Sequence, residues 1–332
     1  MKHAYARGLT LIELMIAMLL GLIVIAGVIS VMISNKSSYR TNEGLAQVQE
    51  SARTAFELIS RDIRQAGGNG CNNNDRTANV LTASSLWWQD WFGVRGIDGA
   101  DVDTAVAVGT TMGTRVAGTD SIQVQGIEGA GLPVSLHSAA GTTIAINAAS
   151  TTFQTGDIML VCDMDHATIF QATGYDSSTR TITHASSGGT PGNCASGLGF
   201  PTICDAGIGN VYTFGINSQV SRLTAVDWYV GNNDRPAEGG RSLFRRRLSP
   251  GGVEVTEEIV AGVTNLDIRY GENGSDVIQN AGVGVNWANV NSVFITLTAD
   301  SADTNVTTDR SVNTGRIQRT FTYLITLRNR VP

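Results

Sequence analysis

The chain of 332 residues has few of the groups that catalytic and metal sites use. It has four cysteines and four histidines, and the histidines are scattered: His3, His137, His166 and His184. It contains no H-E-x-x-H zinc motif, no G-x-S-x-G nucleophile motif and no phosphate-binding P-loop. The acids within 98–103 and 300–305 lack the spacing of a calcium loop, so we interpret them as solvated turns. We therefore expect no enzyme, no cofactor and no metal centre.

Basic charge and proline are also scarce. Lys and Arg number 23 against 29 Asp and Glu, which gives a formal net charge of −6. This balance argues against nucleic acid as a partner, because a general nucleic-acid surface needs a basic stripe. The chain has 6 prolines and 38 glycines. Together with many Thr, Ser, Val and Asn residues, this composition is typical of a β-rich, loop-rich extracellular domain.

Charge is absent altogether from Leu14 to Ile29. The wider apolar run, 9–33, would form a helix about 37 Å long, enough to cross a bilayer core of about 30 Å. Lys2 and Arg7 precede this run, so we expect a single membrane pass with the N-terminus in the cytoplasm. Glu13 lies at the edge of the run. A carboxylate there is costly, which marks Glu13 as a functional residue.

The junction Gly8-Leu9-Thr-Leu-Ile-Glu13 resembles the class III leader of type IV prepilins and type II secretion pseudopilins. The resemblance implies that prepilin peptidase removes residues 1–8 by cutting after Gly8, and that Leu9 becomes an N-methylated N-terminus. The family usually has Phe in place of Leu9. Loss of Lys2 and Arg7 with the leader would take the net charge from −6 to −8. In the family, a carboxylate such as Glu13 pairs with a mature N-terminus in the membrane.

A helical pattern continues beyond the apolar run. Apolar residues recur at spacings of three and four, which predicts an amphipathic second half over 34–66: Leu45, Val48, Ala52, Phe56, Ile59 and Ile63. No proline interrupts the apolar half, 9–33. We therefore expect one helix from about Thr10 to Ala66, which ends before Gly67 because glycines favour helix termination.

From Cys71 onward the pattern has a period of two, which predicts a large antiparallel β-rich head over 71–332, as one body or two lobes. The overall fold class is therefore α+β. The Gly/Ser-rich stretch 184–204 is expected to be a surface loop. The predicted strands are 120–125, 157–161, 167–171, 211–214, 223–230, 242–248, 253–260, 266–270, 293–298 and 320–327.

The even cysteine count on the outer side of a membrane predicts two disulfides, with three possible pairings. We favour a short loop closed by Cys194 and Cys204, which leaves Cys71 to pair with Cys162. The rival interpretation is a zinc site that includes His166 or His184, but no C-x-x-C spacing supports it.

Two segments are candidate interaction surfaces. The first holds four aromatic residues, Trp87, Trp88, Trp91 and Phe92; exposed, it would indicate a protein partner, although burial in the core is the more common state. The second is the strand 245–247, with three consecutive arginines. We interpret it as a solvated face paired with Glu254, Glu257 and Glu258, and DNA binding for uptake is the alternative.

Further segments resemble the larger minor pilins of the PilW type: 61–67 followed by Cys71, 156–161 before 167–171, 227–232 and 327–330. The resemblance implies a structural minor pilin in the inner membrane, later on the pilus at the cell surface, that helps to prime assembly near the filament tip. Its partners would be other minor pilins, the major pilin and, as a further candidate, a tip adhesin, in a system that supports twitching motility and cell adhesion. A type II secretion pseudopilin and a pilus-borne adhesin or DNA-binding module are the alternatives.

The leader predicts a defined mature N-terminus. N-terminal sequencing and mass spectrometry of the protein from membrane and filament fractions should show a chain that starts at methylated Leu9. A mature chain that retains Met1, or one that begins beyond Ile33, would contradict this prediction.

Overall fold

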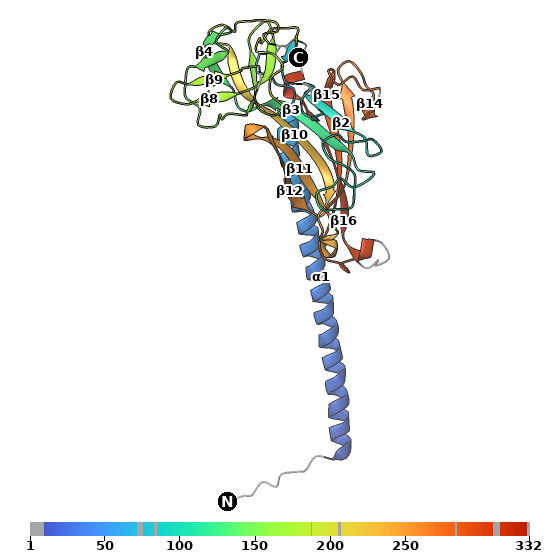
Figure 1. Cartoon of the computed structure of the whole chain (residues 1–332). Helices are drawn as coiled ribbons and strands as arrows, with labels where there is room; N and C mark the ends of the chain where they lie inside the picture. The colour runs from blue at the N-terminus through green and yellow to red at the C-terminus, as the bar shows by residue number, and fades with distance from the viewer. Residues whose placement is uncertain are drawn as a thin grey trace, which may run out of the picture.

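The computed structural model describes residues 10–71, 76–82, 85–186, 188–204, 207–282, 284–307 and 313–330. It contains one long helix, α1 (Leu11–Gln65), that runs into a large β-rich head (Figure 1). The head is built mainly of antiparallel strands. The expected α+β fold is therefore confirmed.

The two ends of α1 follow from local sequence. Thr10 is the N-cap, and its side chain accepts a hydrogen bond from the backbone N–H of Glu13. At the other end Ala66 leaves the helical conformation, and Gly67 follows with a φ of 72°. A glycine adopts that left-handed conformation without the strain of a Cβ atom. The predicted bounds of Thr10 and Ala66 are thus confirmed as the two caps.

Strands β13 to β16 form a four-stranded sheet in the order β14-β13-β15-β16, and the other twelve strands form one large sheet. Three short 3-10 turns of the described chain lie between strands, and a fourth follows the last strand: η1 (Pro236–Glu238), η2 (Pro250–Gly252), η3 (Asn313–Gly315) and η4 (Arg328–Arg330). The strands are β1 (Thr77–Asn79), β2 (Val94–Ile97), β3 (Ser121–Ile127), β4 (Leu132–Ser138), β5 (Thr143–Ile146), β6 (Ile158–Cys162), β7 (Ala167–Gln171), β8 (Gly174–Asp176), β9 (Thr181–Thr183), β10 (Gln219–Asn232), β11 (Arg241–Ser249), β12 (Val253–Ala261), β13 (Val263–Glu272), β14 (Ile278–Asn280), β15 (Val290–Asp300) and β16 (Gln318–Thr326).

The 14-residue strand β10 holds the large sheet together. Its first residues pair with β4 and β6, and its later residues pair with β3 and β11. The strands β4, β8 and β9 lie at the end of the head farthest from the start of α1, whereas β12 and β16 lie beside the helix (Figure 1). A single strand therefore connects the far end of the head to the part that contacts the helix.

The largest buried cluster surrounds the second half of α1. Val48, Ala52, Ile59 and Ile63 of the helix are fully buried there. They pack with the inner faces of β13 and β15 and with residues of β3 and β10. These four side chains belong to the predicted apolar stripe, whereas Leu45 and Phe56 are only half-buried. The apolar stripe of α1 is therefore the surface against which the head packs.

Two disulfides join distant parts of the head. Cys71, just beyond the helix, is bonded to Cys162 at the end of β6, and Cys194 is bonded to Cys204. This is the favoured pairing, and it leaves no free cysteine among the described residues. The rival zinc site is wrong, because its sulfur ligands are oxidised to disulfides.

Two local predictions are wrong. Residues 211–214 form no strand, because the backbone N–H of Phe214 donates to Nδ1 of buried His137 at 2.9 Å instead of to a neighbouring strand. The stretch 184–204 is not a surface loop, since much of it is buried. Its backbone N–H groups at Cys194, Gly197 and Gly199 donate to carbonyls of other segments, which satisfies them away from water.

The disulfides predict a graded loss of stability. The Cys71–Cys162 bond spans 91 residues and the Cys194–Cys204 bond spans 10. Because loop-closure entropy grows with loop length, replacing the first pair by alanine should lower the free energy of unfolding by about 4.5 kcal/mol, and the second by about 2.7 kcal/mol. Urea unfolding of the full chain in detergent would measure both losses. A larger loss for the short loop would contradict the ranking.

Candidate functional site on the N-terminal helix

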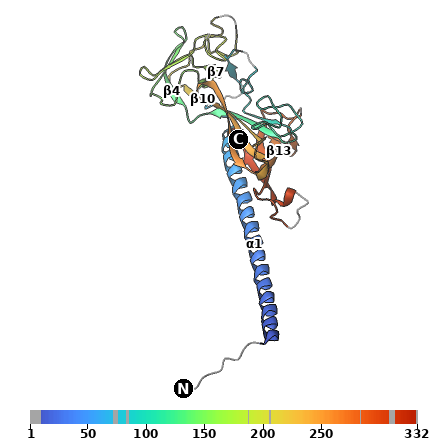
Figure 2. The same cartoon turned by 60° about the horizontal axis from the view of Figure 1, so that its bottom comes forward.

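The first half of α1 has no protein around it. Every described residue from Thr10 to Tyr39 is exposed except Gly21, which is half-exposed. The large apolar side chains from Leu11 to Ile33 are 48% to 77% exposed. We call 11–39 the stem; at a rise of 1.5 Å per residue it is about 43 Å long. Figure 1 and Figure 2 show that it leaves the head at one end with no other element beside it.

By length and composition, α1 is the one helix among the described residues that could cross a membrane. Its most apolar window has a mean hydropathy of 2.9, and none of that window is buried. An apolar surface of this extent is not stable in water and must be covered by lipid or by other apolar helices. The stem is therefore the part of the molecule that must be buried in a membrane or against the helices of other subunits.

Glu13 lies in the first turn of the stem. Its Oε2 atom accepts hydrogen bonds of 3.0 Å from both the backbone N–H and the hydroxyl of Thr10. Within the described part of the chain, the other carboxylate oxygen has no hydrogen-bond donor. The cap thus fixes the side chain and leaves Oε1 free for a cation from another molecule. Gly8 and Leu9, the predicted cleavage and methylation positions, lie outside the described residues.

The head begins to hold the helix where the stem ends. The Nη2 atom of Arg40 donates to the carbonyl of Thr304 at 3.1 Å and lies 3.8 Å from the carboxylate of Asp303. The hydroxyl of Thr41 donates to the carbonyl of Val306 at 3.1 Å. Arg40 is therefore tied to the head, which explains a basic residue shortly after the apolar run.

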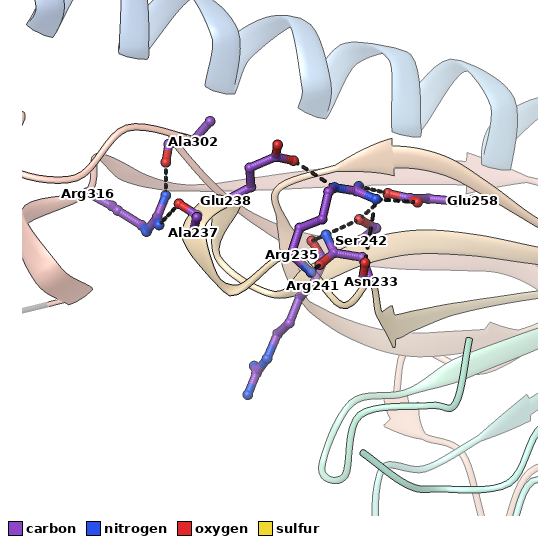
Figure 3. Close-up of polar contacts among 9 residues, drawn as sticks. All are labelled: Asn233, Arg235, Ala237, Glu238, Arg241, Ser242, Glu258, Ala302 and Arg316. Carbon is purple, nitrogen blue, oxygen red and sulfur yellow. Dashed lines mark hydrogen bonds and ion pairs between the residues drawn. The ribbon is translucent and has the colours of Figure 1, made fainter. Parts of the chain in front are cut away.

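A buried arginine fixes the lower end of the head next to this contact. The guanidinium of Arg316 donates to the carbonyl of Ala302 and, at 2.6 Å, to that of Ala237 (Figure 3). It thereby ties the connection between β15 and β16 to the turn between β10 and β11. Beside it Arg235 lies between the carboxylates of Glu238 and Glu258 (Figure 3). The two sheets are joined where the helix enters the head.

Farther up, polar and aromatic contacts join the helix to both sheets. The indole N–H of Trp228 on β10 donates to Asp62 of α1 at 2.9 Å. Burial raises the pKa of the Asp62 carboxyl, and the Trp228 hydrogen bond opposes that rise. The ring of Phe56 stacks on that of Tyr323 on β16, with centroids 3.8 Å apart. Helix and head are therefore one packed unit over this half of α1.

The C-terminal end of the chain closes the top of the helix. The side-chain amide of Asn329 donates to the carbonyls of Gln65 and Ala66 at 3.2 and 3.3 Å. The guanidinium of Arg330 donates to the carbonyl of Phe92 at 3.1 Å. The two Asn329 bonds satisfy carbonyl groups that the end of α1 leaves without intrahelical partners.

Three of the segments that resemble minor pilins meet at this junction. The segment 61–67 supplies Asp62 and the helix end, 227–232 supplies Trp228, and 327–330 supplies Asn329 and Arg330. A fourth, 156–161, is followed by Cys162, which is bonded to Cys71 beyond the helix. Segments that are far apart in the sequence thus all contribute to the contact between the head and the helix.

The aromatic segment is not an exposed surface. Trp87 is 5% exposed and Trp88 is 1% exposed, and the indole of Trp88 donates to Glu254 at 2.8 Å. Trp91 and Phe92 are half-buried and pack against the buried hydrophobic cluster that contains Trp87 and Trp88. The alternative of an exposed interaction surface is therefore wrong for Trp87 and Trp88, which pack in the core.

The arginine strand is paired with acids, largely as expected. Arg245 and Arg247 bind Glu257, and Arg246 binds Glu254. Hydrogen bonds from Arg247 and Arg245 lower the pKa of the Glu257 carboxyl to about 2. The expected pairing with Glu258 is wrong, because Glu258 binds Arg235. Each of the three arginines is therefore paired with an acid, although Arg245 and Arg247 share Glu257.

The acidic turns are less solvated than expected. Asp103 is 4% exposed and Asp300 is 5% exposed. The carboxylate of Asp300 accepts hydrogen bonds from the side-chain amides of Asn313 and Gln318. Across the described ranges, no group of three or more His, Cys, Asp or Glu side chains has a metal-binding arrangement.

A comparison with protein families matches residues 4–29 to the prokaryotic N-terminal methylation motif. The match covers the leader junction, Glu13 and most of the apolar run. It supports a type IV pilin-like or prepilin-type protein, anchored in a membrane by its helix and processed by prepilin peptidase for assembly with other pilins. A comparison with curated proteins gives no significant match.

The helix–head junction predicts a coupling between Trp228 and Asp62. Replacing Trp228 by phenylalanine leaves a partly buried carboxylate without its indole donor and should cost about 1–3 kcal/mol of unfolding free energy, measured by urea titration in detergent. The Trp228→Phe change should cost less in an Asp62→Ala background, since the hydrogen bond is already lost. Equal losses in both backgrounds would show that the bond contributes nothing.

Proposed function

We propose that this chain is a structural minor pilin of a type IV pilus, without catalytic activity, that helps to prime pilus assembly near the filament tip. The observation that carries this proposal is the bare apolar stem with a fixed carboxylate in its first turn, below a head that packs against one face of the rest of the same helix. A subunit of this shape can be held in a membrane and later packed beside other helices without refolding its head.

The stem would act in two environments. Before assembly it spans the inner membrane, where lipid covers its apolar side chains. During assembly the apolar stems of other pilins replace the lipid. Cleavage after Gly8 would create an ammonium group on Leu9 in this apolar layer, and an unpaired charge there costs several kcal/mol. Glu13 of a neighbouring subunit would neutralise it through its free carboxylate oxygen.

Glu13 also bears on the position of the subunit. A subunit at the very end of a filament has no neighbour ahead of it whose ammonium needs a carboxylate. Because this chain has Glu13, we place it just below the tip, in contact with other minor pilins and with the major pilin. A tip adhesin is a further candidate partner above it.

A type II secretion pseudopilin would share the leader and the stem. The two functions differ in what loss of the gene blocks: pilus formation and twitching motility, or export of a secreted enzyme. A pilus-borne adhesin or DNA-binding module is less well supported, since Trp87 and Trp88 are buried and the arginine strand is paired with acids.

The proposal predicts that Glu13→Ala blocks incorporation into pili and leaves membrane insertion and cleavage intact. Since each 1.4 kcal/mol is about a tenfold change, loss of a charge pair worth several kcal/mol should reduce the amount in sheared filaments by more than about tenfold. Immunoblots of membrane and filament fractions would measure both steps.

The matched control is Glu50→Ala, which removes an exposed carboxylate from the same helix in the part beside the head. This variant should enter filaments like the wild type. Equal recovery of Glu13→Ala and wild type in filaments would refute the assigned role of Glu13. Normal piliation in a strain without the gene would refute the priming role.

A further inference from the structure

Polar atoms without partners gather at one place inside the head. Among the described residues, six buried side-chain nitrogen or oxygen atoms have no hydrogen bond, and four of these belong to Arg115, Gln123 and Asp227. Asp227 contributes both carboxylate oxygens and is 0% exposed. A buried carboxylate without donors is too costly to remain ionised unless something else compensates it.

Strand register explains why these groups meet. Asp227 on β10 is the direct partner of Gln123 on β3 and of Arg246 on β11, so the three side chains emerge on the same face of the sheet. The connection between β2 and β3, which we call the cover loop (98–120), crosses this face and brings Asp103 and Arg115 to it. The group therefore lies between the sheet and its cover.

Asp103 has the contacts of an ionised carboxylate. Its Oδ1 atom accepts from the backbone N–H of Ala105 at 2.8 Å and from the side-chain amide of Gln123 at 3.0 Å. Its Oδ2 atom accepts from the hydroxyl of Ser121 at 2.5 Å. Three donors thus stabilise a negative charge on Asp103, and none of them reaches Asp227.

The cations that face Asp227 are engaged elsewhere. The Nη atoms of Arg115 donate to the carbonyls of Thr119 and Asp101 at 2.6 Å each. Arg246 binds Glu254. Burial and the charge of Asp103 raise the pKa of the Asp227 carboxyl well above its ordinary value, and Arg115 and Arg246 only partly oppose the rise. The remaining titratable neighbours are Tyr229 and Tyr270, and burial raises the pKa of both.

We propose that Asp227 is protonated and donates its O–H to the Asp103 carboxylate, so that a single shared proton latches the cover loop onto β10. A metal ion suits this place poorly, because Gln123 turns its amide nitrogen towards Asp103 and the guanidinium of Arg115 lies alongside. The latch is independent of the pilin function proposed above. It is a pH-sensitive closure of the cover loop, whose Ala105 and Val106 pack in the same buried cluster as Trp87 and Trp88.

The direction of the pH effect follows from linkage. Because the pKa of Asp227 is higher in the folded state than in the unfolded chain, its contribution to stability is complete below the unfolded value, about 3.9. The contribution is lost as the pH rises through the folded pKa. The latch is therefore closed at low pH and opens as the pH rises through the folded pKa of Asp227, when two carboxylates repel each other beneath the cover loop.

Infrared spectroscopy of the full chain in detergent micelles tests the proton directly. The wild type should show the C=O band of a buried neutral carboxylic acid at a pH where free carboxyl groups are ionised, and the band should disappear as the pH is raised further. Asp227→Asn should remove it. Asp157→Asn is the matched control: Asp157 is also 0% exposed, but backbone N–H groups of Gln154 and Gly251 bind its carboxylate, so this change should leave the band.

Thermal unfolding against pH gives a second readout. Asp227→Asn keeps an N–H donor for Asp103, so it should fold and show a melting temperature close to wild type at low pH. It should lack the decrease in melting temperature that the wild type shows as Asp227 ionises. Absence of the acid band in the wild type, or persistence of the band in Asp227→Asn, would overturn the proposal. So would a rise in melting temperature on addition of calcium to the wild type but not to Asp227→Asn, which would assign a cation in place of the proton.

Discussion

Covering the stem is the requirement on which the other features of this molecule depend. About 43 Å of helix leaves the head with its apolar side chains in contact with nothing. Such a helix is stable only within lipid or among other apolar helices, so the head must be complete without it. The structure meets this condition: α1 changes at Arg40 from a helix with no neighbours to one whose apolar face is packed against the head.

Because stem and head share one continuous helix, force or displacement at the stem reaches the head directly. The contacts along the upper half are therefore distributed rather than concentrated. Thr41 is held at the entry, Phe56 and Asp62 contact the two sheets, and Asn329 closes the helix end. Arg316 joins the sheets at the same entry point (Figure 3). A head seated in this way moves with its helix as a rigid unit.

Much of this could be predicted from the sequence because the signals are local. The helix caps, the apolar stripe and long strands such as β10 and β15 follow from patterns within a few residues of each other. The cysteine count predicted two disulfides and left three pairings open, of which the favoured one is present. The prediction missed the short strands β1, β2, β5, β8, β9 and β14, since three or four residues carry too little periodicity. It also missed the seven-residue strand β4. Residues 211–214 have a strand pattern, yet a hydrogen bond to His137 fixes their conformation, and no local signal announces it.

The candidate sites divide in the same way. Glu13 can be identified from one sequence, because it is a charged residue at the edge of a long apolar run. Asp227 can be recognised only from the structure, where its carboxylate is buried without a donor among the described residues. In the sequence it is one polar residue in the alternating pattern of a strand. Trp228 faces the helix and binds Asp62, while Asp227 faces the cover loop and Asp103. One face of β10 therefore contacts the helix, and the other face contacts the cover loop. The alternation of polar and apolar residues in β10 suggests that Asp227 is exposed to solvent, whereas in the structure it is buried.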